Sequence, residues 1–585
     1  MKNLTGGALL RLCALVGAVG LVGCQTSDLP LIGGDETTPL LQRVVDDPDG
    51  PRLSLAPRND YPRSIYDIDY NRWVTVVEDD TLRDYVRSVA GKLAAEVPAI
   101  GDEAEEIDVF ITSHSTAHVS ATPSNDILIS LDVLQSLENE DQLAFLLAHE
   151  IGHIALDHFK RDKVQEAQYK TSEIAKFMGY VGQMLAKSTL QRSAQGGIEV
   201  QTDELAYEKS VRKIELVVSA LQIAAEGVVD TAWTRRQEND ADKLGLDIMA
   251  AAGYKTSQIP GAFNILINDK EESSERTKLL VRRLVALAQE LSLLSTEEPW
   301  RQQFQAFVIE KMGEGTQSMM DSLGKKHQAI SKRNETVLAY AATTLQARPG
   351  KPTVEPFVAA LSNSQSRRIQ GVIEESWAAS ETFLNHVSAT VGTTEDDISD
   401  DGLDGAISLA KQAVRADGGL SFPRLTSFQM MQQATQLDRA IAELKAVQNS
   451  REAGPSVLMH LAVANADAGN EDAAYAAVDR LESQYEPASI FYLRAMVDFT
   501  VRDYEAAQLT LAECFSQAER AFALACENVE ESFAQQARDD NVEVDSGSKG
   551  LFRGIGDTLR QGFQDAGQAF SDIKTGGANS DPVPE

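Results

Sequence analysis

The chain has 585 residues, of which 43% are hydrophobic and 24% charged, and this is the composition of a folded protein. Its length exceeds what one compact core supports, so we expect two to four domains. The formal net charge of −34 argues against a nucleic-acid partner, because a phosphate backbone would be repelled rather than neutralised.

The first predicted element is a lipoprotein signal peptide over residues 1–23. Lys2 and Arg11 precede an apolar run that is too short to span a bilayer and is typical of a secretory signal. The run ends in Leu-Val-Gly-Cys, which resembles the lipobox of bacterial lipoproteins and implies cleavage before a lipidated Cys24. Because Gln25 follows rather than an aspartate, we expect an outer-membrane anchor that faces the periplasm. A plain signal peptide with an incidental cysteine is the alternative.

The predicted elements that follow are a tether, a mixed segment and a long helical region. Residues 24–62 are rich in Pro, Gly and Asp and lack periodicity, so we predict a flexible tether. A helical pattern covers residues 79–97, and two short strands are predicted at 107–114 and 126–130. From there to about residue 530 most of the spacing is helical. The predicted fold class is therefore mainly α with a small β-sheet.

One helical stretch carries the sequence His-Glu-Ile-Gly-His from His149 to His153. Residues four apart share a helix face with Cβ atoms about 5–6 Å apart, which suits two imidazoles on one zinc ion. Glu150 can take a proton from the attacking water as that water adds to a carbonyl. With eight histidines in the chain, a chance match is expected on the order of 0.01 times per sequence of this composition. The pattern therefore indicates a zinc-dependent hydrolase.

A zinc site needs a third protein ligand, and a second acidic helix offers one. Glu238 and Asp242 lie at positions i and i+4 of a helical segment. Glu238 can complete the coordination, while Asp242 can accept a hydrogen bond from the second ring nitrogen of a ligating histidine. By themselves these residues also fit a solvated acidic helix face.

Both motifs together resemble the HtpX-type family of gluzincin metallopeptidases, which joins HExGH to a distant ExxAD. The resemblance covers roughly residues 70–340. It implies one zinc ion held by His149, His153 and Glu238, with Glu150 as the catalytic base and Asp242 behind a ligand. The C-terminal repeats described below make the chain most similar to the periplasmic BepA-type members, which degrade misassembled outer-membrane proteins.

The chain departs from the family pattern at three places. The strand before the motif lacks the usual Asn-Ala, and the interval from His153 to Glu238 is long, which bears on substrate preference. His158 is common at its place in the family, and we expect a structural role rather than metal binding. The family segment HPxxxxR reads here as His327 to Arg333 without the proline. His327 could bind zinc as an inhibitory ligand, stabilise the oxyanion of the reaction, or be a surface residue.

A repeat of helical segments occupies the C-terminal part. Segments aligned on Asp438, Asp472 and Glu505 recur at steps of 34 and 33 residues and resemble tetratricopeptide repeats. Such stacks present a concave surface for peptides or partner proteins. Cys514 and Cys526 could pair in an oxidising periplasm or remain two buried thiols. The predicted domains are a metallopeptidase domain at 63–345, a helical connector at 346–400, repeats at 401–530 and a tail with an amphipathic helix at 531–585.

The resulting prediction is a lipid-anchored zinc metalloendopeptidase of the periplasm. Its substrates would be misfolded or misassembled envelope proteins, with envelope partners bound by the repeats. The leading alternative is a lipoprotein scaffold or chaperone that binds clients through its repeats and has little or no peptidase activity. The intact Glu150 favours the enzyme. A cell-wall amidase is a weaker option, because nothing in the chain resembles a glycan-binding module.

Overall fold

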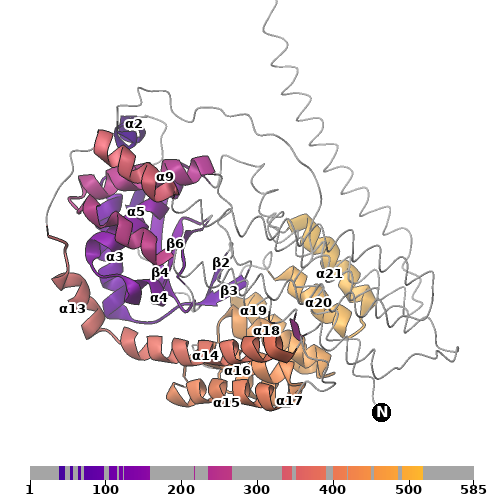
Figure 1. The fold of residues 1–585 in the computed structure, drawn as a ribbon. Helices are drawn as coiled ribbons and strands as arrows, with labels where there is room; N and C mark the ends of the chain where they lie inside the picture. Colours follow the sequence, from indigo (N-terminus) through magenta and orange to yellow (C-terminus); the bar gives the residue numbers. More distant parts are fainter. Residues whose placement is uncertain are drawn as a thin grey trace, which may run out of the picture.

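The computed structural model contains a mainly helical chain with a small mixed sheet, so the predicted fold class is confirmed (Figure 1). It describes residues 39–46, 53–56, 64–67, 72–97, 105–114, 117–122, 124–158, 216–217, 220, 235–266, 332–344, 351–390, 400–417, 419–449, 453–484 and 490–517. The signal peptide, Cys24, His327, Cys526 and the tail at 531–585 lie outside these residues. Within them, no helix has the length and apolarity needed to cross a membrane.

A four-stranded sheet and a separate hairpin form the β part. In sheet order the strands are β1 (Leu53–Leu55), β4 (Glu105–Thr112), β6 (Asp126–Ser130) and β5 (Val119–Ala121), and the hairpin is β2 (Ser64–Asp67) with β3 (Arg72–Thr75). β4 pairs in parallel with β1 and β6, whereas β5 runs antiparallel to β6 with Ser120 opposite Leu128. β5 is therefore an edge strand among the described residues.

Successive side chains along the strands point to opposite faces of the sheet, and both faces are apolar. Ile107, Val109 and Ile111 of β4 point into the core that the sheet shares with the helices. Phe110 and Leu128 point to the other face, where they pack against the hairpin. The sheet is thus covered by helices on one side and by β2–β3 on the other.

Helices α3 (Asp80–Ala94) and α5 (Glu140–Ala155) pack on the first face. Helix α9 (Arg235–Ala251) packs on α5, and α4 (Leu131–Ser136) follows directly after β6. Asp79 and Asn139 cap α3 and α5 by accepting backbone N–H bonds from Leu82 and Gln142, each at 3.0 Å. Every α5 residue from Asp141 to Ala155 is buried, so this helix forms the centre of the peptidase core.

The folded part of the chain begins earlier than predicted. Helix α2 (Leu40–Asp46) and strand β1 both fall within residues 24–62, where we predicted a flexible tether. Leu40 and Val44 are buried against the peptidase core, and the backbone N–H of Leu41 donates to Asp247 of α9 at 3.1 Å. The tether prediction is therefore wrong for these two segments, because tertiary contacts order a stretch that has no strong local signal.

The second half of the described chain is a stack of helices, each of which contacts its neighbours. They are α13 (Glu355–Asn363), α14 (Ser366–Thr390), α15 (Asp400–Ala416), α16 (Ser421–Gln433), α17 (Leu437–Lys445), α18 (Pro455–Asp467), α19 (Glu471–Gln484), α20 (Phe491–Thr500) and α21 (Tyr504–Gln517). Cys514 of α21 is buried and disulfide-bonded.

The predicted repeat period recurs in the turns of this stack. Thr435, Gly469 and Arg502 each adopt a positive φ, of 58°, 74° and 68°, two residues before α17, α19 and α21 begin. The residue after each one closes a six-residue turn by donating its N–H back to the preceding helix, at 2.8–2.9 Å. The same turn is thus repeated at steps of 34 and 33 residues. The tetratricopeptide assignment itself stays a prediction.

The two halves of the chain share one apolar core. Phe357 of α13, Ile369 of α14 and Phe422 of α16 belong to the same buried cluster as Ile107 of β4. β3 also contacts α18 beside the hairpin (Figure 1). The predicted boundary near residue 345 therefore does not coincide with a break in the packing.

Candidate active site

Helix α5 carries three of the predicted site residues on its C-terminal half. His149, Glu150 and His153 are 9%, 5% and 0% exposed, although all three are polar. Buried polar side chains need partners, and a cluster of them inside an otherwise apolar helix indicates a site rather than a core. The apolar residues of α5 hold the helix in place, and the three polar side chains face α9 and β5.

Helix α9 approaches α5 so closely that their backbones touch. A Cβ atom added to Gly245 would lie 2.8 Å from the backbone nitrogen of His149, and one added to Gly152 would lie 2.9 Å from the carbonyl oxygen of Ala241. Only glycine permits this approach without displacing backbone. The close packing brings Glu238, in the first turn of α9, to the ring nitrogens of α5.

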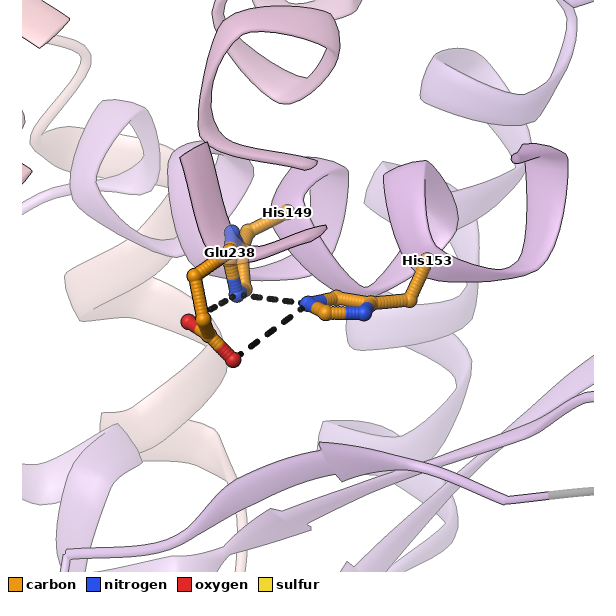
Figure 2. Close-up of side chains that lie close together, drawn as sticks. All are labelled: His149, His153 and Glu238. Atoms are coloured by element: carbon orange, nitrogen blue, oxygen red, sulfur yellow. Dashed lines mark hydrogen bonds and ion pairs between the residues drawn. The ribbon is translucent and has the colours of Figure 1, made fainter. Parts of the chain in front are cut away.

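The three predicted ligands lie together, as Figure 2 shows. Their ligand atoms lie within 4.8 Å of one another. The Nε2 atoms of His149 and His153 are 3.2 Å apart, and the Glu238 carboxylate lies 3.7 Å from the first and 3.8 Å from the second. Tetrahedral zinc with bonds of roughly 2.0–2.1 Å keeps its ligands roughly 3.3 Å apart. Two imidazoles and one carboxylate, buried at these separations, fit a zinc ion.

Asp242 lies behind His149, at the second ring nitrogen. Its Oδ1 is 2.9 Å from His149 Nδ1. Although burial alone would raise the pKa of Asp242, the guanidinium of Arg333 holds it below its ordinary value, so the carboxylate stays ionised. The same carboxylate lowers the tendency of the His149 ring to rotate, because it binds the nitrogen that points away from the metal position.

Arg333 joins the site from the helix over residues 332–344. It donates two hydrogen bonds of 2.8 Å to Asp242 and pairs with Glu238, and its Nη2 lies 3.3 Å from His149 Nε2. Sequence reasoning matched Arg333 to a family segment but gave it no contact. His327, the other matched residue of that segment, lies outside the described residues.

Glu150 contacts both the ligand cluster and the edge strand. Its carboxylate lies 4.0 Å from His149 Nε2, and helix α5 packs against β5. Burial raises the pKa of Glu150 above its ordinary value, and the neighbouring His149 opposes this shift. A carboxylate with a raised pKa beside a metal position has the properties of a general base.

Two further histidines border the site. His158 lies with its Nδ1 3.0 Å from Nδ1 of His153. His118, the residue before β5, lies 2.9 Å from the Ser120 hydroxyl through Nε2. His118 was not among the site residues predicted from the sequence. The missing Asn-Ala at this strand was the signal that could have pointed to it.

The site thus defines a class: a metallopeptidase domain built on a His-Glu-x-x-His helix, with a glutamate supplied by a second helix. Residues 80–305 match the model of Peptidase family M48. For this part of the chain, the match confirms the family resemblance predicted from the sequence.

The similar proteins carry related names at low identity. The chain is 20% identical over 206 residues to the beta-barrel assembly-enhancing protease of Escherichia coli (strain K12), a match that covers 35% of this chain and 37% of that protein. A putative beta-barrel assembly-enhancing protease of Vibrio cholerae serotype O1 is 22% identical over the same length and shares. Metalloprotease YcaL of Escherichia coli (strain K12) is 23% identical over 176 residues, which are 30% of this chain and 58% of that protein. The chain thus spans little more than a third of the first two relatives.

Proposed function

We propose that this chain is a zinc-dependent metalloendopeptidase that hydrolyses misfolded or misassembled proteins of the bacterial envelope. The observation that carries the proposal is the buried cluster of His149, His153 and Glu238 with the Glu150 carboxylate beside it. The family M48 domain supports a metallopeptidase, and the donor set supports zinc as the metal.

The chemistry that we propose divides the work among four side chains. Zinc, when bound, supplies a Lewis acid that polarises the peptide carbonyl and makes water more acidic. His149, His153 and Glu238 hold it. Glu150 takes a proton from the attacking water as the new C–O bond forms, and it returns that proton to the amine nitrogen as the C–N bond breaks. Water is consumed, and a carboxylate and a protonated amine are released.

The edge strand β5 is the proposed binding place for substrate backbone. Residues 118 and 122 direct their backbone groups to β6, since the carbonyl of His118 accepts from Ser130 and the N–H of Thr122 donates to Asp126, each at 2.8 Å. The backbone groups of Val119 and Ala121 therefore face the other edge. An extended substrate segment would add to this edge as a strand. Main-chain binding suits unfolded clients of many sequences.

The finer parts of the proposal concern the anchor and the clients. We propose that Cys24 carries the lipid, that the mature protein faces the periplasm from the outer membrane, and that the helix pairs from α14 to α21 bind client or envelope proteins. The lipobox-like sequence and the names of the relatives support this proposal. Replacing Cys24 with serine should move the protein to the soluble fraction; retention in membranes after a salt wash would count against a lipid anchor.

The proposed function is tested by comparing the wild type with Glu150→Gln. We expect the variant to bind one zinc ion per chain and to keep its helix content, while its cleavage of a denatured β-barrel protein falls by about 10²–10⁴-fold. Glu138→Gln, which makes the same chemical change at an exposed position before α5, serves as the matched control and should retain activity.

The outcomes separate the enzyme from the scaffold alternative. Equal cleavage by wild type and Glu150→Gln would exclude Glu150 as the base. Binding of the denatured client by both proteins, with cleavage by neither, would instead favour a scaffold or chaperone that acts through its repeats.

A further inference from the structure

We infer that His158 is a positioning residue that holds the ring of His153 with Nε2 directed at the metal position. The inference rests on the proposed function, because it takes His153 as a zinc ligand. His158 is not one of the three proposed metal ligands.

The contact between the two rings is short and buried. Nδ1 of His158 lies 3.0 Å from Nδ1 of His153, and the ring planes meet edge to face at 73°. The side chains are 1% and 0% exposed, so water does not compete for the bond. Two facing ring nitrogens can form a hydrogen bond only if one carries a proton and the other does not.

The proton on this bond is assigned by the role of the opposite nitrogen. His153 must present an unprotonated Nε2 to bind a metal, so its neutral ring carries the proton on Nδ1. That Nδ1–H then donates to Nδ1 of His158. The bond therefore selects the tautomer that binds metal and also prevents the His153 ring from turning about χ2, which would exchange the two nitrogens.

The backbone delivers His158 by a turn rather than by the helix. Five residues correspond to about 140° around a helix axis, so a continued α5 would direct His158 away from His153. Instead α5 ends at Ala155, and Asp157 adopts a φ of 54° in the left-handed region. The N–H of His158 then donates to the carbonyl of His153 at 3.1 Å, which closes a Schellman turn. Backbone and side chain of His158 thus both bind His153.

The two histidine ligands consequently have partners of different charge. The second nitrogen of His149 is bound by a carboxylate, Asp242, which Arg333 fixes in turn. The second nitrogen of His153 is bound by a neutral ring. His158 fixes orientation without adding another negative charge to a site that already contains Glu150, Glu238 and Asp242.

The test compares two substitutions at one position in the full-length protein. His158→Asn keeps an acceptor close to the place of Nδ1, whereas His158→Phe keeps a ring without an acceptor. We expect the phenylalanine variant to lose about 10–100-fold in zinc affinity, measured by competition with a chelator, and the asparagine variant to stay within about 3-fold of the wild type. After cobalt substitution, the visible absorption spectrum of the phenylalanine variant should differ from that of the wild type. The spectrum of the asparagine variant should stay close to it.

The controls separate this inference from packing and from the proposed function. His386→Phe, on α14, makes the same change outside the site and should leave zinc affinity unchanged. If His158→Phe does not fold, His158→Leu replaces it with the same expectation. Wild-type affinity in the variant without an acceptor, or an equal loss in His158→Asn, would overturn the inference. If His158→Phe binds zinc more weakly than His158→Asn, but the wild type cleaves no substrate, the inference about His158 holds. That result would count against the proposed function alone.

Discussion

At the scale of single residues, Arg333 is the counter-charge of the site. Asp242 is fully buried, and Glu238 is 9% exposed at its side chain, so neither carboxylate is stabilised by bulk water. Arg333 contacts both of them, and its planar guanidinium gives Asp242 two parallel hydrogen bonds. A lysine at this position would supply charge but could not form the paired bonds.

Replacing Arg333 with methionine should therefore destabilise the metal-free protein. We expect a loss of about 3 kcal/mol in the free energy of unfolding, because two buried carboxylates lose their partner. Urea unfolding in the presence of a chelator measures this loss, and Lys332→Met, at the exposed neighbouring position, should leave the midpoint unchanged. Equal midpoints for the two variants would mean that Arg333 contributes nothing to the charge balance.

The ligand residues could be predicted from sequence, whereas several of their contacts could not. His149, His153 and Glu238 belong to motifs with fixed helical spacing and a chemical reason for each position. Asp242 followed from its place one turn after Glu238. Arg333 is 91 residues away from Asp242, and no local pattern predicts a pairing over that distance.

At the scale of elements, the site depends on how closely α5 and α9 pack. The two helices are in contact at Gly152 and Gly245, which have no side chain to hold the backbones apart. Glu238 reaches the histidines only because the helices pack this closely. Gly152 lies inside the His-Glu-Ile-Gly-His motif, so the sequence already draws attention to it. It draws none to Gly245, since a glycine inside a helix does not reveal which backbone it will touch.

Gly245→Ala should push the helices apart and damage the metal site. The new Cβ would meet backbone atoms of Ala148 and His149 at 2.8–3.0 Å, and such contacts can be relieved only by moving a helix. We expect a loss of about 1–3 kcal/mol in stability together with weaker zinc binding. Gly371→Ala is the matched control, because a Cβ on this α14 glycine meets nothing within 4 Å. Alanine there should be neutral or stabilising by about 0.5–1 kcal/mol. Identical zinc affinity in both variants would refute this account of the helix contact.

At the scale of the whole molecule, the helical content and the repeat period were predictable, but the extent of the core was not. Periodic apolar spacing identifies a helix wherever it packs. Strand β1 has three residues, too few for a pattern, and it forms by pairing with β4. Phe422 lies in a helix of the repeat half yet packs with the peptidase core. A chain that ended near residue 346 would lack Phe357 and Phe422 from that core.

The shared core predicts that the peptidase domain and the helical stack unfold as one unit. Phe428 of α16 is 1% exposed and belongs to the core of the stack, not to that of the peptidase. Its replacement by alanine should cost about 3–5 kcal/mol. If the halves are coupled, Phe428→Ala lowers the guanidinium midpoint for zinc release as much as the midpoint for loss of helical ellipticity. Leu509→Ala, at a side chain that is 66% exposed, should move neither midpoint. A shift in ellipticity with zinc release unchanged would show that the halves unfold separately despite their common core.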